Sequence, residues 1–304
     1  VAFNFGKTEE QIKEILTRSS KKLLAEREKR IRPGLDDKVL TSWNALMITA
    51  FAKGYQISQE SKYLDAAENC VKFIEKNLFD GEQLLRTYKD GKSKIQGYLD
   101  DYSYFVNALL DVFEITSNPK YLNLAKKLAH YVVDHFWDSE NNSFFMTADN
   151  HEKLIIRPKS NYDLSVPSGN SVSAFVLLKL YHITHENNFL DVATKLLESQ
   201  AQMAAENPFG FGFFLNTMYL YLKKPTEITI LNTKNKELCK SIYEKFIPES
   251  IIVSVNYSDN LDSLQKYPFF EGKNFDENKT QVFVCKNFTC SLPLEKIDEI
   301  ESHL

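Results

Sequence analysis

The sequence has 304 residues, of which 43% are apolar and 26% are charged, as in one or two globular domains with sizeable cores. This composition excludes an intrinsically disordered chain, a collagen and a disulfide-rich scaffold. The 37 Lys and Arg residues nearly balance the 41 Asp and Glu residues, so the net charge of -4 gives no signature of nucleic-acid or anionic-membrane binding. Only 10 residues are glycine, which argues against sandwiches and propellers built on many tight turns.

The 4 cysteines are too few for a disulfide framework and predict a reducing compartment, which we take to be the cytoplasm. No run approaches the roughly 18 apolar residues of a membrane helix, and no signal-peptide pattern follows Val1. A zinc site at Cys285 and Cys290 would need further ligands from Cys239 and His303. The spacing of this pair therefore favours a buried thiol pair or a labile disulfide, and we expect no metal and no other cofactor.

Apolar residues recur with helical spacing from the N-terminal region to about Leu222. The pattern predicts helices over 8–28, 42–57, 61–78, 101–116, 119–136, 170–185, 188–205 and 210–222. We expect 40–222 to be almost wholly helical, and a sheet inside 40–136 would contradict a helical repeat.

The predicted helices repeat as pairs. An aromatic residue opens the second helix of each pair, 19 residues after a residue at the start of the first helix; these residues are Asn44 and Tyr63, Tyr102 and Tyr121, and Asn170 and Phe189. Each pair therefore predicts a helical hairpin, and the longer segments 78–100 and 137–168 return the chain to the next pair. Short hairpin turns with long returns are typical of an α/α toroid, in which the return loops cluster at one mouth.

After Lys223 the pattern changes to short β-like runs. They predict strands over 227–231, 251–255 and 281–285, with a helix over 235–246. The β-α-β order predicts a small parallel sheet and a boundary near Pro225. We thus expect an α/α toroid over 1–222 and a small α/β segment over 223–304. A Gly-rich phosphate loop is absent, so nucleotide binding is not expected.

Polar clusters occupy the return loops and the starts of the first helix of each pair. They comprise Asp36, Asp37, Lys38, Trp43 and Asn44; then Tyr98, Asp100, Asp101 and Tyr102; then Arg157, Asp163, Ser168 and Asn170.

At these clusters the chain resembles the C-terminal helical region of the spermatogenesis-associated, thioredoxin-domain-containing protein family. The blocks Asp-Asp-Lys…Trp-Asn, Asp-Asp-Tyr and Pro-Ser-Gly-Asn-Ser occur in the family's order, and 284–290 is similar to its C-terminal block. The resemblance covers essentially the whole chain and implies a six-hairpin toroid of the glycosidase and N-acylglucosamine 2-epimerase kind. About eight helices are predicted where a closed ring has twelve, so the ring is open or is completed by upstream residues or a partner. The family also implies a thioredoxin-like domain. Because this chain has no Cys-x-x-Cys motif, we expect that domain upstream or in trans.

A single Asp or Ser at a helix start is explained simply as an N-cap, and for each residue taken alone we favour that interpretation. Adjacent acidic pairs in two successive repeats exceed what a cap needs. If the repeats close, Asp36, Asp37, Asp100, Asp101 and Asp163 converge at one mouth, where like charges raise one pKa and separate an acid from a base. We therefore predict Asp37 and Asp101 as the catalytic carboxylates.

The remaining cluster residues are predicted to bind substrate. Trp43 and Tyr102, together with Tyr98, offer stacking faces to a sugar ring. Lys38 and Arg157 would bind a carboxylate or phosphate, or would neutralise the acidic cluster, and the second role is at least as strong. The predicted binding set is completed by Asp36, Asn44, Asp100, Asp163, Ser168 and Asn170.

All six histidines lie outside these clusters, which favours carboxylate chemistry over His-based epimerisation. His151 is the exception to watch, because the 137–168 loop can fold over the mouth. The leading hypothesis is a domain that binds or processes a sugar or sugar acid. The alternatives are a non-catalytic scaffold that serves a redox partner, and a mouth that recognises a peptide or modified protein.

Geometry separates these hypotheses. Two carboxylates that face each other across roughly 5–10 Å of open cavity favour glycosidic chemistry, whereas a mouth plugged by the 137–168 loop favours a scaffold. We expect Asp37, Trp43, Asp101, Tyr102 and Asn170 to surround one cavity. Because Asn caps a helix about as well as Asp, Asp101→Asn is predicted to keep the melting temperature and to abolish stabilisation by sugars.

Overall fold

The structure is a computed structural model that describes residues 3–152, 155–287 and 289–304. It divides into two compact units, residues 1–38 and 39–304. In the first unit, α1 (Glu9–Arg27) begins with a capping box: the Gln11 N–H donates to the Thr8 hydroxyl, and the Thr8 N–H donates to the Gln11 side chain. This confirms the helix predicted over 8–28. Phe288, part of the predicted C-terminal block, lies outside the described residues.

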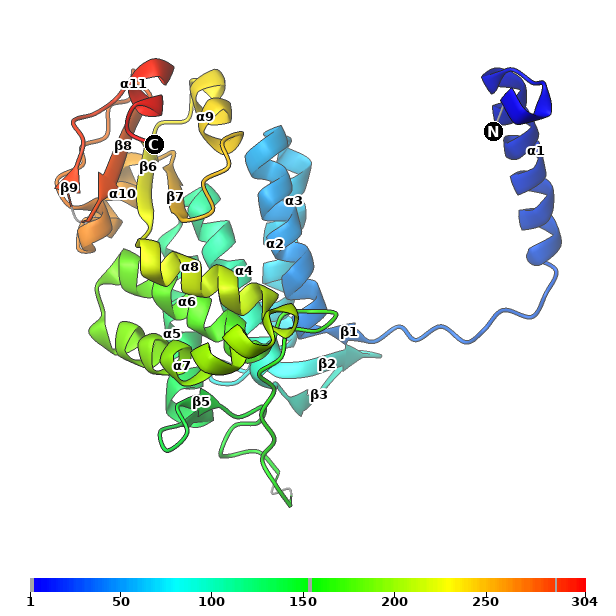
Figure 1. The fold of residues 1–304 in the computed structure, drawn as a ribbon, viewed down its shortest axis with the longest axis horizontal. Coiled ribbons are helices and arrows are strands. Elements are labelled where there is room, and N and C mark those ends of the chain that lie inside the picture. Colours follow the sequence, from blue (N-terminus) through cyan, green and yellow to red (C-terminus); the bar gives the residue numbers. More distant parts are fainter. Residues whose placement is uncertain (1–2, 153–154, 288) are drawn as a thin grey trace. The chain divides into compact units, whose positions relative to one another are not determined.

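The second unit is built from helical hairpins joined by return loops (Figure 1). The described hairpins are α2 (Thr41–Ser58) with α3 (Ser61–Asn77), α4 (Leu99–Thr116) with α5 (Pro119–Phe136), and α6 (Gly169–Thr184) with α7 (Asn187–Glu206). The helices α2, α4 and α6 pack in a row, and α8 (Gly212–Lys223) extends that row beyond α6. The predicted fold class is confirmed: the chain is mainly α, an arc of the α/α-toroid type with a small C-terminal α/β segment.

The hairpins share one turn geometry. The first helix of each ends at a residue with a left-handed backbone, Gln59, Ser117 or His185, with φ of 57°, 53° and 56°. In each case the N–H of that residue donates to the carbonyl four residues earlier, and the second helix begins two residues later. A left-handed residue at this position ends a helix and reverses the chain. The common turn explains the regular spacing of the sequence repeat.

The expectation that 40–136 holds no sheet is wrong. Strands β2 (Leu85–Lys89) and β3 (Lys92–Gln96) form an antiparallel hairpin in the first return loop, and β1 (Val39–Leu40) pairs with β2. Their turn is Asp90-Gly91, with φ of 50° and 73°, a dipeptide typical of two-residue hairpin turns. The repeat survives because this sheet lies in a connection and replaces no helix.

A second short strand pair opens the other return loop, and a larger sheet follows the last helix of the row. The further elements are β4 (Trp137–Asp138), β5 (Ser143–Phe144), β6 (Thr226–Leu231), α9 (Lys236–Tyr243), β7 (Ser250–Val255), α10 (Ser258–Leu264), β8 (Gln281–Lys286), β9 (Thr289–Cys290) and α11 (Ile297–Glu301). Three short 3-10 turns complete the described structure: Phe3–Phe5, Pro208–Gly210 and Pro268–Phe270.

The C-terminal sheet has the order β7-β6-β8-β9. Strands β6 and β7 are parallel, as the β-α-β pattern predicts, but β8 runs antiparallel to β6 and β9 antiparallel to β8. The sheet is therefore mixed and not parallel throughout. Helix gives way to strand between Lys223 and Thr226, near the predicted boundary, while the division into domains at residue 222 stays a prediction.

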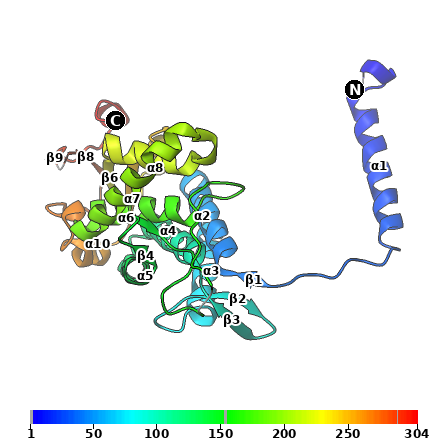
Figure 2. The ribbon, with the colours of Figure 1, turned by 60° about the horizontal axis from the view of Figure 1, so that its bottom comes forward.

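One face of the sheet shares a core with the helices of the row, and the other face forms a separate core with α9. Val253 and Val255 of β7 belong to the same buried cluster as Phe105 and Phe113 of α4, and the Asn260 side chain donates to the last carbonyl of α4. The C-terminal segment thus packs at the end where α4 terminates. The starts of α2, α4 and α6 lie at the opposite end, beside the β2–β3 hairpin (Figures 1 and 2).

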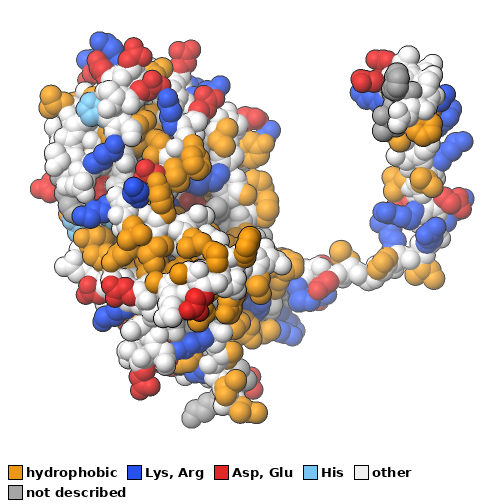
Figure 3. Space-filling model, viewed as in Figure 1, with side chains coloured by type: hydrophobic (Ala, Val, Ile, Leu, Met, Phe, Trp, Pro, Cys, Tyr) orange, Lys and Arg blue, Asp and Glu red, His pale blue; other side chains and the backbone are white. Residues whose placement is uncertain are grey.

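Apolar side chains are also exposed at both ends of the helical row. Helix α2 exposes Trp43 and Met47, and α8 exposes Leu215, Tyr219 and Leu222. Figure 3 shows apolar side chains gathered on the face that carries α8. A closed ring would cover both ends, so this exposure agrees with an open arc. None of the described helices combines the length and the apolar character that crossing a membrane requires.

Candidate functional site

The starts of three helices meet at Asp100 and Asp101, in the first turn of α4. Asp101 Oδ1 accepts a hydrogen bond from the backbone N–H of Ser42 on α2 at 3.0 Å, and Asp100 accepts one from the backbone N–H of Gly169 on α6. Helix N-termini carry unpaired N–H groups and a partial positive charge, which stabilise carboxylates. The fold thus brings parts of all three sequence clusters to one junction, which we name the three-helix junction.

Asp101 is fully buried and has three N–H donors. In addition to Ser42, the backbone N–H of Tyr98 and Nη1 of Arg86 each donate to Oδ2 at 2.9 Å. Burial raises the pKa of Asp101, and the guanidinium and the N–H groups oppose that rise. Because these partners occupy both carboxylate oxygens, Asp101 holds the junction together. These contacts argue against the predicted catalytic role of Asp101. They also argue against the expectation that Asn could replace Asp101 without loss of stability.

Asp100 is half-buried and has a different environment. Its pKa is raised first by burial and then by the charge of Asp101, while Arg86 and the Gly169 N–H lower it. Glycine is required at position 169 because a Cβ there would lie 2.7 Å from Asp100 Oδ1 and 2.8 Å from Leu99 Cγ. Of the two adjacent carboxyl groups, Asp100 combines solvent access with a raised pKa.

Two residues that the sequence did not assign to the site flank this pair. Arg86, on β2, stacks its guanidinium over the ring of Tyr98 at 4.6 Å while it contacts Asp101. His151, in the second return loop, lies with its ring 5.5 Å from that of Tyr98 and its Nε2 3.2 Å from the Gly97 carbonyl oxygen. The sequence singled out His151 as an exception, but no local pattern marked Arg86. Within the described residues no group of three or more His, Cys, Asp or Glu side chains is arranged to hold a metal.

Trp43 and Asn44 lie in the first turn of α2. The Trp43 side chain is 66% exposed, so its ring is accessible to a ligand. Asn44 donates from Nδ2 to the Leu40 carbonyl at 2.8 Å and accepts from the Cys70 thiol at 3.6 Å. Asn44 therefore supports the helix start.

Tyr102 and Asn170, predicted to line a cavity, are buried, and their polar atoms form hydrogen bonds with backbone groups. The Tyr102 hydroxyl accepts a hydrogen bond from the Leu84 N–H at 2.9 Å. The Asn170 side chain accepts from the Phe144 N–H at 2.7 Å and donates to the carbonyls of Phe144 and Ser160, both at 3.0 Å. Both side chains attach return loops to helix starts, and neither presents a free face to a ligand in this structure.

Three further predicted binding residues also hold backbone in place. Ser168 caps α6 by accepting from the Ser171 N–H at 3.0 Å. Asp163 accepts from the N–H groups of Ser168 at 2.7 Å and Phe214 at 2.9 Å. Arg157 donates from Nη2 to two backbone carbonyls, at 2.5 and 3.1 Å. The capping interpretation therefore describes Ser168, and Asp163 performs a similar task for two helices.

Asp36, Asp37 and Lys38 belong to the first unit and are exposed there. Lys38 Nζ lies 2.6 Å from Asp36 Oδ2, which agrees with the neutralising role considered for this lysine. Catalysis by Asp37, and substrate binding by Asp36 and Lys38, stay predictions.

The fold and the junction define a helical-hairpin domain of the α/α-toroid class, with a carboxyl pair where three helix starts meet. No family model matches the chain. The chain is similar to spermatogenesis-associated protein 20 of Homo sapiens, with 26% identity over 308 residues and 96% of the chain covered. It is also similar to an uncharacterized protein of Caenorhabditis elegans, with 27% identity over 289 residues and 90% covered. The chain spans 39% of the length of each relative, and the resemblance predicted from the ordered blocks is confirmed.

Several solved structures are similar to about half of the chain. They include a cellobiose 2-epimerase from Bacillus thermoamylovorans, at a TM-score of 0.48 and 14% identity, covering 55% of this chain and 46% of the other. A glycoside hydrolase family 76 mannosidase from Bacteroides thetaiotaomicron has a TM-score of 0.47 and 17% identity, with coverage of 55% and 45%. A D-mannose isomerase has a TM-score of 0.45 and 21% identity, with coverage of 55% and 44%.

Proposed function

We propose that this domain binds and processes a carbohydrate at the three-helix junction, with Asp100 as the proton-transfer group. The observation that carries the proposal is the unequal carboxyl pair: Asp101 is buried under three N–H donors, and Asp100 is half-exposed with a raised pKa. A general acid must hold its proton near neutral pH, and burial beside a second carboxylate acts in that direction. Asp100 therefore takes the role that the sequence assigned to Asp101.

The surroundings of Asp100 suit a polyhydroxylated ligand. The Arg86 side chain is 27% exposed, and its guanidinium can donate to hydroxyl or carboxylate oxygens. Trp43 follows Ser42, whose N–H binds Asp101, and its exposed ring offers an apolar face of the kind that packs on the C–H face of a sugar. A neutral sugar and a sugar acid both fit these groups. The carboxylate of a sugar acid would form a stronger hydrogen bond with the guanidinium than a sugar hydroxyl would.

A ligand screen with matched variants tests the proposal. Monosaccharides, disaccharides and sugar acids are screened for a rise in the melting temperature of the 304-residue chain, and the products of each stabilising sugar are analysed. Asp100→Asn is expected to lower turnover by about 100-fold or more, because it removes the transferable proton. Asp65→Asn, an exposed carboxyl group on α3, is the control and should behave as the parent. Absence of any stabilising sugar, or full turnover by Asp100→Asn, contradicts the proposal.

A second candidate is a scaffold or protein-recognition domain, and the second return loop favours it. The Leu99 N–H donates to the Met146 carbonyl at 3.0 Å, and His151 contacts the Gly97 carbonyl, so loop residues pack on the start of α4. If this loop gates a sugar site, His151→Ala should tighten sugar binding. If the loop seals a scaffold, neither the parent nor this variant binds any sugar of the screen.

A further inference from the structure

A disulfide between Cys285 and Cys290 closes the β8–β9 hairpin at the edge of the C-terminal sheet. The two cysteines are opposite each other in the ladder but differ in access: Cys285 is 2% exposed, whereas Cys290, on the edge strand, is exposed. Thiol–disulfide exchange begins with a thiolate that approaches one sulfur, so access selects which sulfur is attacked. An incoming thiolate therefore reaches Cys290 first.

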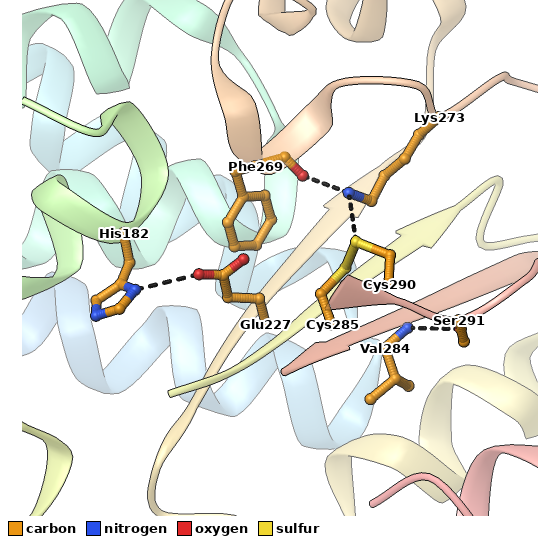
Figure 4. Close-up of a disulfide and its surroundings, with 8 residues drawn as sticks. All are labelled: His182, Glu227, Phe269, Lys273, Val284, Cys285, Cys290 and Ser291. Carbon is orange, nitrogen blue, oxygen red and sulfur yellow. Dashed lines mark hydrogen bonds and ion pairs between the residues drawn. A yellow bond between two sulfur atoms is a disulfide. The ribbon is translucent and has the colours of Figure 1, made fainter. Parts of the chain in front are cut away.

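A buried lysine lies against this disulfide (Figure 4). Lys273 is 3% exposed; its Nζ donates to the Phe269 carbonyl at 2.5 Å and lies 3.9 Å from Cys290 Sγ. Burial lowers the pKa of Lys273 to about 8, and the charge of Glu227 opposes that shift. The Glu227 carboxylate itself pairs with His182 at 3.1 Å.

The disulfide supplies no negative charge to this ammonium, and the carboxylate whose charge acts on it is that of Glu227. A buried cation is costly without an anionic partner, and a disulfide sulfur is neutral and a weak acceptor. After reduction, a Cys290 thiolate would place a negative charge beside Lys273 Nζ. A nearby cation lowers the pKa of a thiol and stabilises its thiolate. The surroundings therefore favour the reduced state more than an apolar site would.

We propose that Cys285–Cys290 is an exchange-active disulfide, reduced by an external protein dithiol through Cys290, with Lys273 as the positioning cation for the Cys290 thiolate. The partner's first thiolate attacks Cys290 Sγ, the disulfide bond breaks, and the Cys285 sulfur leaves with the electron pair and takes up a proton. The partner's second thiolate then attacks its own sulfur in the mixed disulfide and releases the Cys290 thiolate. Two electrons pass to the chain, and the dithiol becomes a disulfide.

The role of Lys273 is tested by redox equilibrium of the folded chain. The parent is equilibrated with defined ratios of reduced and oxidised dithiothreitol, the thiols are alkylated, and the Cys285–Cys290 pair is quantified by peptide mass. Half-reduction of Lys273→Met is expected to require about a tenfold higher ratio of reduced to oxidised dithiothreitol. This change corresponds to a rise of about one unit in the pKa of the Cys290 thiol. Lys273→Arg should recover most of this change. Lys286→Met, which removes an exposed lysine next to Cys285, is the control and should match the parent.

Melting curves of the oxidised variants establish that each is folded. Two results overturn the proposal: a parent disulfide that resists excess dithiothreitol while the chain stays folded, or Lys273→Met and Lys286→Met with the same half-reduction ratio.

The access of each sulfur and the stability of its thiolate are compared in single-cysteine variants. In Cys285→Ala, Cys290 should form a mixed disulfide with glutathione disulfide about tenfold or more faster than Cys285 does in Cys290→Ala, because Cys290 is exposed and lies beside the ammonium. Peptide mapping separates these adducts from any on Cys70 or Cys239, the free cysteines of the described chain. Equal rates at the two positions would refute the assignment to Cys290.

Discussion

Replacement of Asp101 by Asn tests whether this residue holds the three-helix junction. An Asn amide can accept the Ser42 N–H through its oxygen, but its NH₂ group would then face two donors, the Tyr98 N–H and the Arg86 guanidinium. The variant therefore loses two of the three hydrogen bonds, one of them to a charged group. Asp101 is buried, so no water replaces these partners without rearrangement.

The size of the effect follows from these contacts. A hydrogen bond to a charged group contributes about 1.5–3 kcal/mol, and a buried donor without a partner costs about 1–3 kcal/mol. Arg86 is 27% exposed and can regain hydration, which reduces the loss. We expect Asp101→Asn to lower the free energy of unfolding by about 3 kcal/mol, or roughly 6–12 °C in melting temperature for a unit of this size.

The assay is urea and thermal denaturation of the parent, Asp101→Asn, Arg86→Met and the double variant. Because Asp101 and Arg86 contact each other, the double variant should lose clearly less than the two single losses added together. A melting temperature of Asp101→Asn within about 2 °C of the parent would refute the reasoning and restore the interpretation of Asp101 as a plain cap.

Three further outcomes are expected. Gly169→Ala places a Cβ 2.7 Å from a carboxylate oxygen of Asp100 and should lower stability by about 1–3 kcal/mol in urea denaturation, whereas Gly212→Ala, with nothing within 4 Å, should change it by less than about 1 kcal/mol. Lys179→Met leaves two buried carboxylates of α4 without this partner and should lower stability by about 3–5 kcal/mol, whereas Lys53→Met, at a 50% exposed side chain, should cost about 1 kcal/mol or less. The Asp100 pKa is raised on folding, so its contribution to stability is complete below the unfolded pKa near 4 and is lost as pH rises through the folded pKa. The melting temperature of Asp100→Asn minus that of the parent should therefore increase over this interval, and a constant difference would contradict the raised pKa.

The helical hairpins could be predicted because their signals are local. Apolar residues at helical spacing indicate each helix. A left-handed residue at Gln59, Ser117 and His185 keeps the number of residues between the two helices of each hairpin constant. The β2–β3 hairpin was missed because its strands are only half-buried and short, so they show no clear alternation. The Asp90-Gly91 turn was the available signal.

The site was predictable in part for a related reason. The helix starts carry the polar clusters, so the sequence located the junction. Arg86 reaches Asp101 from β2, in the return loop that leads into α4, and this contact depends on how that loop folds back onto the start of the helix. Asn170 has an amide that can bind either a sugar or backbone. The structure shows that this amide binds the backbone N–H and carbonyl of Phe144.

The hydrogen bonds of Asn170 have an evolutionary consequence. They fasten the second return loop to α6 at Phe144 and Ser160, while Ile155 and Ile156 between these anchors are 104% and 72% exposed. Because closing a longer loop costs little, with about 0.6 kcal/mol for each doubling of its length, the stretch around Ile155 and Ile156 can be lengthened without disturbing the helices if the contacts of Met146 and His151 with the start of α4 are kept. Descendants of this scaffold can therefore acquire new recognition properties in that stretch while their folding stays the same.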